Sequence, residues 1–265
     1  MESATQSRAL KSDVVLALRG QRSDRPAIDP FLAGGLRSWL EDDLSKCAES
    51  LSPETPFVLT PRSTTSQALV AVPNMLALAR GALVSVLAAQ RIALGEVRHP
   101  MDDALSALEA DPYQHDVVES IHALDQDAFA QLAAEVSAHD DVLRRHLSLV
   151  PTTWFPRSNV KLTAPLAGGR LLLTARVNVV LGTPSQSVAS VCFLDLTTSL
   201  LDDQVLRRLG VLSLIETLRS GAPPLRVASL STATGDVAML EVTDDVLAEA
   251  VTDVVTAAHQ RGEQS

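Results

Sequence analysis

The stretch 159-NVKLTAPLAGGRLLLTARVNVVLGTPSQSVASVCFLDL-196 decides the fold of this chain. It holds three runs rich in Val, Leu and Ala, at 159–166, 170–181 and 188–196. Gly168 and Gly169 separate the first two runs, which is typical of a compact hairpin turn. The stretch therefore predicts three strands that follow one another closely.

Helices and further strands are expected on both sides of this stretch. Apolar periodicity and capping residues predict helices at 14–18, 36–51, 75–94, two or three within 101–147, then 203–219 and 244–259. Further strands are expected at 57–60, 225–230 and 237–242. Gly95 is expected to cap the end of the 75–94 helix, Gly221 lies just beyond the 203–219 helix, and Thr243 is expected to cap the start of the last helix. This order predicts an α/β fold with a mixed central sheet flanked by helices, and a helical N-terminal and middle region.

Several side chains carry predictions of their own. Trp39 lies on the apolar face of the 36–51 helix and is expected to be a core anchor, while Gly34 and Gly35 are expected to break the pattern before that helix. Cys192 is expected to be a small core residue rather than a disulfide partner of the distant Cys47. The histidines that lack the spacing of a metal site are expected at the solvated surface: His99, His115, His122, His139 and His146.

The chain is expected to form one compact unit made of three parts. Residues 1–65 form an N-terminal extension packed on the core, and residues 66–150 form a mainly helical part that contains the first core helix. Residues 151–265 form the α/β core. A length of 265 residues with 46% hydrophobic residues is enough to bury a sizeable interior.

The composition bounds where the protein works and what it binds. The N-terminus lacks the pattern of a signal peptide and no apolar run matches a membrane span, so a cytoplasmic protein is expected. The composition is also compatible with a bacterial gene of high GC content. The net charge is −10, and residues 66–150 hold 12 acidic against 5 basic residues. Proteins that hold nucleic acid usually present a basic surface, so this balance argues against that partner.

Four segments carry a resemblance to a known family. They are 80-RGALVS-85 on a helix, 169-GRL-171 with 176-RVNVVLG-182 on one strand, 193-FLDLTT-198 on the next strand, and 212-LSLIETLR-219 on the helix that follows. Together they resemble the PD-(D/E)XK nuclease superfamily, and in particular its RecB-like group, over about residues 75–260. The resemblance implies a restriction-endonuclease-like core.

The resemblance also implies a site, which this sequence does not preserve. In the family, acidic side chains of two adjacent strands hold Mg²⁺, and a lysine positions the attacking water. Here Ser85 stands in the place of a histidine ligand, Asn178 in that of an aspartate, and Thr197 in that of the lysine. Asp195 alone keeps its expected type. We therefore expect no catalytic residue, cofactor or metal, with Asp195 as the ligand if any is bound.

Other interpretations of these residues stay open. Lys161 and Glu216 are the side chains that could rescue an Mg²⁺- or Mn²⁺-dependent nuclease with rearranged ligands. Alternatively, Asn178 and Thr197 are polar side chains on a half-buried sheet face, and Asp195 caps a helix or pairs with Arg176. A third hypothesis is binding of nucleic acid without cleavage through four arginines: Arg176, Arg207, Arg208 and Arg226.

The function that follows is that of an inactive nuclease-like protein. Its expected role is that of an interaction or scaffolding subunit in DNA repair or phage defence, by analogy with the family. The expected partner is another protein subunit, and no membrane is expected.

Overall fold

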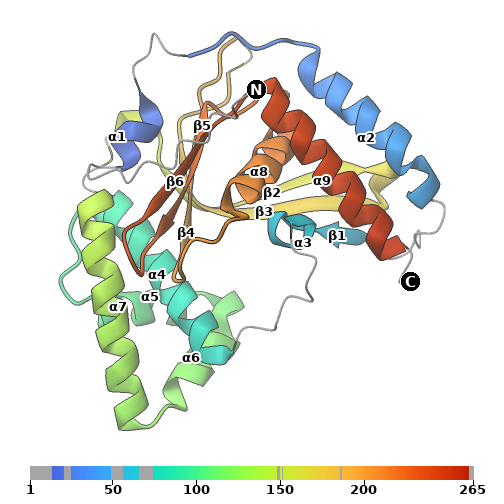
Figure 1. Ribbon diagram of the computed structural model, residues 1–265. Coiled ribbons are helices and arrows are strands. Elements are labelled where there is room, and N and C mark those ends of the chain that lie inside the picture. The colour runs from blue at the N-terminus through green and yellow to red at the C-terminus, as the bar shows by residue number, and fades with distance from the viewer. Residues whose placement is uncertain are drawn as a thin grey trace.

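The computed structural model describes residues 14–20, 25–48, 56–65, 74–147, 150, 152–185 and 187–262. The helices are α1 (Val14–Arg19), α2 (Leu32–Ala48), α3 (Pro61–Thr65), α4 (Met75–Leu94), α5 (Pro100–Glu109), α6 (His115–His122), α7 (Gln126–His146), α8 (Val205–Ser220) and α9 (Asp244–Gly262). The strands are β1 (Phe57–Leu59), β2 (Arg157–Leu166), β3 (Leu171–Leu181), β4 (Cys192–Thr197), β5 (Arg226–Ser231) and β6 (Val237–Glu241). Figure 1 shows their arrangement.

A mixed six-stranded sheet lies at the centre of the molecule. Its main path runs β1-β3-β4-β5-β6, and β2 pairs with β3 outside this path. Strand β3 is antiparallel to both of its neighbours β2 and β4. Strands β4 and β5 are parallel and are connected through α8. A parallel neighbour requires such a crossover, because a tight turn reverses the direction of the chain.

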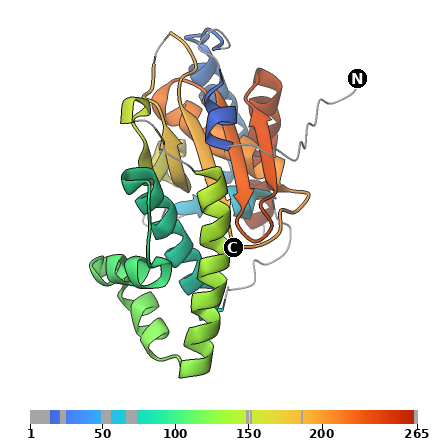
Figure 2. The same cartoon turned by 90° about the vertical axis from the view of Figure 1, so that its left-hand side faces the viewer.

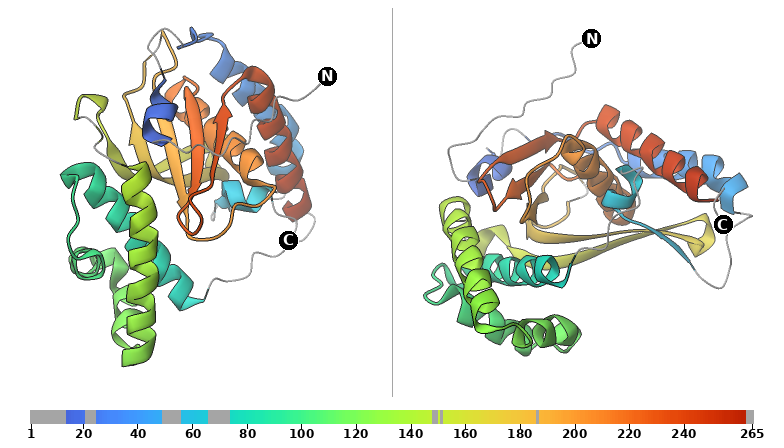
Figure 3. Two further views of the ribbon diagram at one scale, coloured as in Figure 1. Left: turned by 60° about the vertical axis from the view of Figure 1, so that its left-hand side comes forward. Right: turned by 60° about the horizontal axis from the view of Figure 1, so that its bottom comes forward.

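Helices cover both faces of this sheet, which confirms the predicted α/β class (Figures 1 and 3). One hydrophobic core is formed by α1, α4, α5, α6 and α7 together with one side of β4 and β5. The other core joins α2, α8 and α9 with β1, β2, most of β3 and the opposite side of β4 and β5. Strands β3, β4 and β5 therefore bury side chains on two faces, which accounts for the continuous apolar runs of β3 and β4.

Local signals account for the helix that was expected at 75–94. The side chain of Asn74 accepts a hydrogen bond from the backbone N–H of Ala77 at 2.7 Å, which caps the first turn of α4. Gly95 follows the last turn with a φ of 78°, a backbone angle that glycine adopts without a Cβ clash. Both ends of α4 therefore lie where the sequence predicted them.

The N-terminal helix differs from its prediction. Helix α2 begins at Leu32 and runs through Gly34 and Gly35, which were expected to break the pattern. A Cβ at either glycine would meet no atom within 4 Å, so helical backbone is allowed there despite the low helix propensity of glycine. Trp39 is 42% exposed and donates to Asp43 at 2.8 Å, so it is not the predicted core anchor. The buried stripe consists instead of Leu36, Leu40 and Leu44.

Two of the histidines also differ from their predictions. His139 and His146 are only 7% and 8% exposed, because this face of α7 packs inward. Burial lowers the pKa of His139. Strand β3 contributes to both cores, since Leu173 packs in one core and Leu181 in the other. The twist of this long strand carries its two ends to different neighbours, β1 and β4.

The three predicted parts of the chain pack into shared cores. Helix α1 belongs to the same core as α4, and α2 packs against α9 at the other end of the sequence. Strand β1 adds to the sheet beside β3. Figure 2 shows α5, α6 and α7 projecting beyond the sheet as a helical extension.

Helix α4 is the one helix of the described ranges whose length and apolar character would suit a membrane span. Its inner face is buried in the core through Leu83, Val84, Leu87 and Ala88. Cytoplasmic localisation stays a prediction.

A buried ion pair ties α4 to α7. Arg91 donates from Nε and Nη2 to the two carboxylate oxygens of Asp140 at 2.6 and 2.5 Å. The two residues are 5% and 4% exposed. Charges at such depth are tolerated only when they are paired, so removing one partner leaves the other without compensation.

We expect Arg91→Leu to lower the free energy of unfolding by about 3–5 kcal/mol, because Asp140 would remain buried without its counter-charge. The double variant Arg91→Leu/Asp140→Leu should recover most of this loss. Arg144 forms an exposed pair with Asp141, so Arg144→Ala should change stability by no more than about 0.5 kcal/mol. Urea denaturation of the four proteins measures these values, and a double variant as unstable as Arg91→Leu would contradict the explanation.

Candidate functional site

The sheet divides between β3 and β4, and the predicted site lies at this division. The two strands pair only at Val179–Leu194, Val180–Phe193 and Leu181–Cys192. Beyond this point β4 continues beside β5 as far as Thr197, while β3 leads away toward β1. The backbone of β4 from Asp195 onward therefore loses its ladder with β3, and other groups must satisfy it.

The side chain of Asn178 fills this role. Its Oδ1 accepts a hydrogen bond from the backbone N–H of Leu196 at 2.9 Å, and its Nδ2 donates to the Ser85 hydroxyl at 3.0 Å. Ser85 in turn donates to Oδ1 of Asn159 at 2.6 Å. This chain of bonds connects α4, β2, β3 and β4, so Asn178 is engaged by its neighbours on both ends of its amide.

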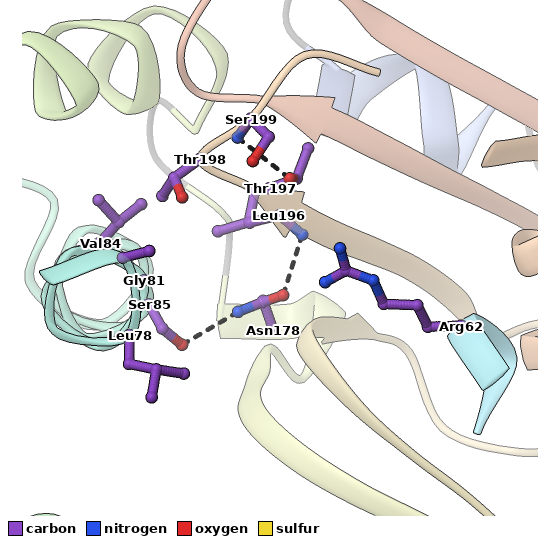
Figure 4. A pocket seen from close by; sticks show the side chains of 11 residues that line it. Arg62, Leu78, Gly81, Val84, Ser85, Asn178, Leu196, Thr197, Thr198 and Ser199 are labelled. Carbon is purple, nitrogen blue, oxygen red and sulfur yellow. Dashed lines mark hydrogen bonds between the residues drawn. The ribbon is translucent and has the colours of Figure 1, made fainter. Parts of the chain in front are cut away.

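A pocket of about 270 Å³ opens beside this network (Figure 4). The residues that line it come from α3, α4, β3, the end of β4 and the segment that follows: Arg62, Ala77, Leu78, Gly81, Val84, Ser85, Asn178, Leu196, Thr197, Thr198 and Ser199. Three of the four predicted positions, Ser85, Asn178 and Thr197, thus meet in one place. Asp195 is not among the lining residues.

Asp195 is half-buried on β4, next to the lining residues Leu196 and Thr197, and interacts with the charge of Arg208 on α8. Its neighbour in β5 is Ser229, and the adjacent Phe193 packs into the core of α8 and α9. Burial raises the pKa of Asp195 to about 6, against the opposing effects of the Arg208 charge and the Leu196 N–H. Arg208 is ion-paired with Asp202 at 2.8 Å, so Asp195 shares this cation with a second carboxylate.

The two residues considered as catalytic substitutes lie elsewhere. Glu216 is buried and accepts two hydrogen bonds from Arg219, each of 2.9 Å. It follows Arg208 by eight residues on α8, which is about 12 Å along the helix axis. Lys161 is exposed on β2, where its neighbour across the strand pair is Arg176. The structure thus brings neither Lys161 nor Glu216 into the pocket lining.

Three of the four arginines considered for nucleic acid are held by carboxylates. Arg207 pairs with Asp253, Arg208 with Asp202, and Arg226 with Glu241. Arg176 is exposed on the sheet surface. The four side chains are spread over β3, α8 and β5 and do not form one strip along which a phosphate backbone would lie.

The donor set at the predicted site differs from that of a magnesium centre. It consists of one carboxylate, Asp195, an amide that already holds two partners, and hydroxyl groups. Mg²⁺ favours carboxylates in octahedral geometry, and no cluster of three His, Cys, Asp or Glu side chains arises among the described residues. Within the described part of the chain, the side chains at this site do not fit the ion.

The structure adds residues that sequence reasoning missed. Arg62 reaches the pocket from α3, which packs against α8 and α9, and Asn159 completes the hydrogen-bond network from β2. Arg62 lies outside the segments that carry the family resemblance, so no motif pointed to it. Asn159 has a φ of 52°, which asparagine tolerates better than most residues, but one residue type is a weak signal.

Comparisons with known proteins do not identify the family. No protein-family model matches the chain, and no curated protein matches it. The crystal structure of SSO0001 aligns with 85% of this chain and 84% of its own, at a TM-score of 0.29 and 10% identity. A likeness at this level carries no argument about fold or function.

The raised pKa of Asp195 predicts a pH-dependent effect on stability. The pKa of Asp195 is 3.8 in the unfolded chain and about 6 in the folded protein. Between these two pH values the unfolded state therefore binds fewer protons than the folded state. Stability therefore falls as the pH rises through this interval, and the penalty is complete above it. Asp195→Asn should raise the free energy of unfolding at about pH 8 by on the order of 2 kcal/mol, and by little at about pH 3.

Urea denaturation at both pH values tests this effect. Asp203→Asn removes one exposed carboxylate near the start of α8 and serves as the control for net charge. An equal gain in both variants, or a gain from Asp195→Asn that persists at low pH, would show that the ionisation of Asp195 is not the cause.

Proposed function

We propose that this protein is a PD-(D/E)XK nuclease-like domain that has lost its catalytic site and acts as an interaction or scaffolding subunit. The observation that carries the proposal is the division between β3 and β4, where Ser85, Asn178 and Thr197 meet with no carboxylate among the described lining residues. DNA repair and phage defence are the processes in which such a subunit is proposed to act, by analogy with the family.

The order of elements supports the nuclease-like part of the proposal. Helix α4 precedes an antiparallel series of three strands, β2, β3 and β4, and α8 then leads to β5, which lies parallel to β4. The substituted positions lie on α4, β3 and β4, where the resemblance places the site. A fold can persist after its chemistry is lost, because the site rests on a few side chains and the fold on the core.

The chemistry of the site supports the loss of catalysis. A hydrolytic nuclease must hold a cation at the scissile phosphate and lower the pKa of an attacking water. Asp195 is not among the residues that line the pocket, and Thr197 has no positive charge. The amide of Asn178 holds Leu196 and Ser85 in place. Each missing electrostatic group typically costs about 10²–10³ in rate.

The helical extension supplies a surface that suits a protein partner. Helices α5 to α7 expose a group of carboxylates: Asp102, Glu109, Asp116, Glu119, Asp125, Asp127 and Asp141. Tyr113 lies between α5 and α6 and is 93% exposed. Tyrosine is enriched among the residues that dominate binding energy at interfaces, and the carboxylates would steer a partner with a basic surface.

Cleavage assays test the loss of catalysis. Linear and single-stranded DNA incubated with the purified protein and Mg²⁺ or Mn²⁺ should show no degradation above that of Asp195→Ala, since one carboxylate does not assemble the metal site. Metal-dependent cleavage that disappears in Asp195→Ala would favour the active nuclease with rearranged ligands and overturn the proposal.

Purification under native conditions tests the role as a subunit. The protein isolated from its own cells should carry another polypeptide at fixed stoichiometry, and Tyr113→Ala combined with Asp116→Lys should reduce its retention at least about tenfold. Lys161→Ser, which alters an exposed residue of the sheet, is the matched control. A strictly monomeric protein without any co-purifying chain would contradict this role.

A further inference from the structure

The pocket beside Asn178 has a chemical character that the proposed function does not use. Among its lining residues in the described part of the chain, Arg62 alone is charged. The other polar members are Thr197 at the end of β4, Thr198 and Ser199 directly after it, the Ser85 hydroxyl and the Asn178 amide. The side facing α4 is formed by the apolar residues Ala77, Leu78 and Val84. The pocket thus combines a cation, hydroxyl donors and an apolar wall, with no lining carboxylate among the described residues.

The direction of Arg62 is the first observation that points to a ligand. Its side chain extends from α3 toward Asn178 and Thr197, across the division of the sheet (Figure 4). No described residue lies within hydrogen-bond or ion-pair distance of the guanidinium. Asp202 is close enough for Arg62 to lower its pKa, but Asp202 is already paired directly with Arg208. The guanidinium therefore keeps its donors available to a molecule in the pocket.

The segment after β4 is held rigidly with its hydroxyl groups beside the pocket. The Thr197 carbonyl accepts bonds from the N–H and the hydroxyl of Thr232, at 2.8 and 3.0 Å. The Ser199 carbonyl accepts from the Ser231 hydroxyl at 2.8 Å. Both carbonyls are thus bound to the end of β5, whereas the hydroxyls of Thr198 and Ser199 have no partner among the described residues. Because the backbone is fixed beforehand, a ligand would pay little entropy to order it.

Size and charge together define the class of ligand. A volume of about 270 Å³ is close to the lower end of small-molecule sites and is far too small for a nucleic-acid duplex. The forked donors of arginine match the oxygens of a phosphoryl group, and hydroxyls supply further donors. We propose that this pocket binds a phosphoryl dianion without a metal, either as inorganic phosphate or as a small phosphate monoester whose organic part contacts the α4 wall. Arg62 is its principal ligand.

This inference stands apart from the proposed function. It requires neither a protein partner nor a degenerate nuclease ancestry, since it rests on the side chains of the pocket alone. A failure to find phosphoryl binding would leave the cleavage and co-purification tests unaffected, and the reverse also holds.

Isothermal titration calorimetry of the full chain in EDTA tests the inference, with inorganic phosphate, ribose 5-phosphate and unphosphorylated ribose as probes. At least one phosphorylated probe should bind with a Kd of about 1 mM or tighter, and ribose should not bind. The tighter of the two phosphorylated probes identifies the source of the phosphoryl group. Arg62→Gln should weaken binding at least about tenfold, because a charge-assisted pair is lost.

Two further variants separate binding from folding. Arg62→Lys keeps the charge but not the fork, so it should retain part of the affinity. Arg176→Gln removes an exposed arginine outside the pocket and should leave the affinity unchanged. Thermal unfolding followed by circular dichroism confirms that each variant is folded. Equal binding of ribose, a dependence on Mg²⁺, unchanged binding by folded Arg62→Gln, or no binding of either phosphorylated probe would overturn the inference.

Discussion

The hydrogen bonds of Asn178 are the interaction on which the rest of the site depends. Strands β3 and β4 pair over three positions and then separate, which leaves the backbone N–H of Leu196 without a strand partner. The amide of Asn178 accepts from that N–H and donates to Ser85 on α4. One side chain therefore holds the open end of β4 and fixes its distance from α4. The pocket exists because this division is kept open and ordered.

The same hydrogen bonds explain why a carboxylate would replace the amide of Asn178 poorly. An amide has both an acceptor and a donor, and the network uses both, because Ser85 gives its own proton to Asn159. A carboxylate at this position has no N–H to offer Ser85. The amide at position 178 thus supplies the donor and the acceptor that stabilise the divided sheet.

Much of the fold could be predicted because its signals are local. Helix α4 has an asparagine cap at one end and Gly95 at the other, and the hairpin between β2 and β3 has adjacent glycines at its turn. Predictions failed where a long-range contact outweighed the local pattern. Trp39 is exposed because the neighbouring Leu36, Leu40 and Leu44 form the buried face of α2 in the core with α8 and α9, and His139 and His146 are buried because α7 turns that face inward.

The sequence by itself determined the order of helices and strands and the α/β class. Only the tertiary structure decided that Ser85, Asn178 and Thr197 share a pocket, that Asp195 does not line it, and that Arg62 joins the pocket from α3. The physical reason is separation along the chain. Periodicity and caps act over a few residues, whereas this pocket gathers side chains from positions 62 to 199, which come together only when both cores have formed.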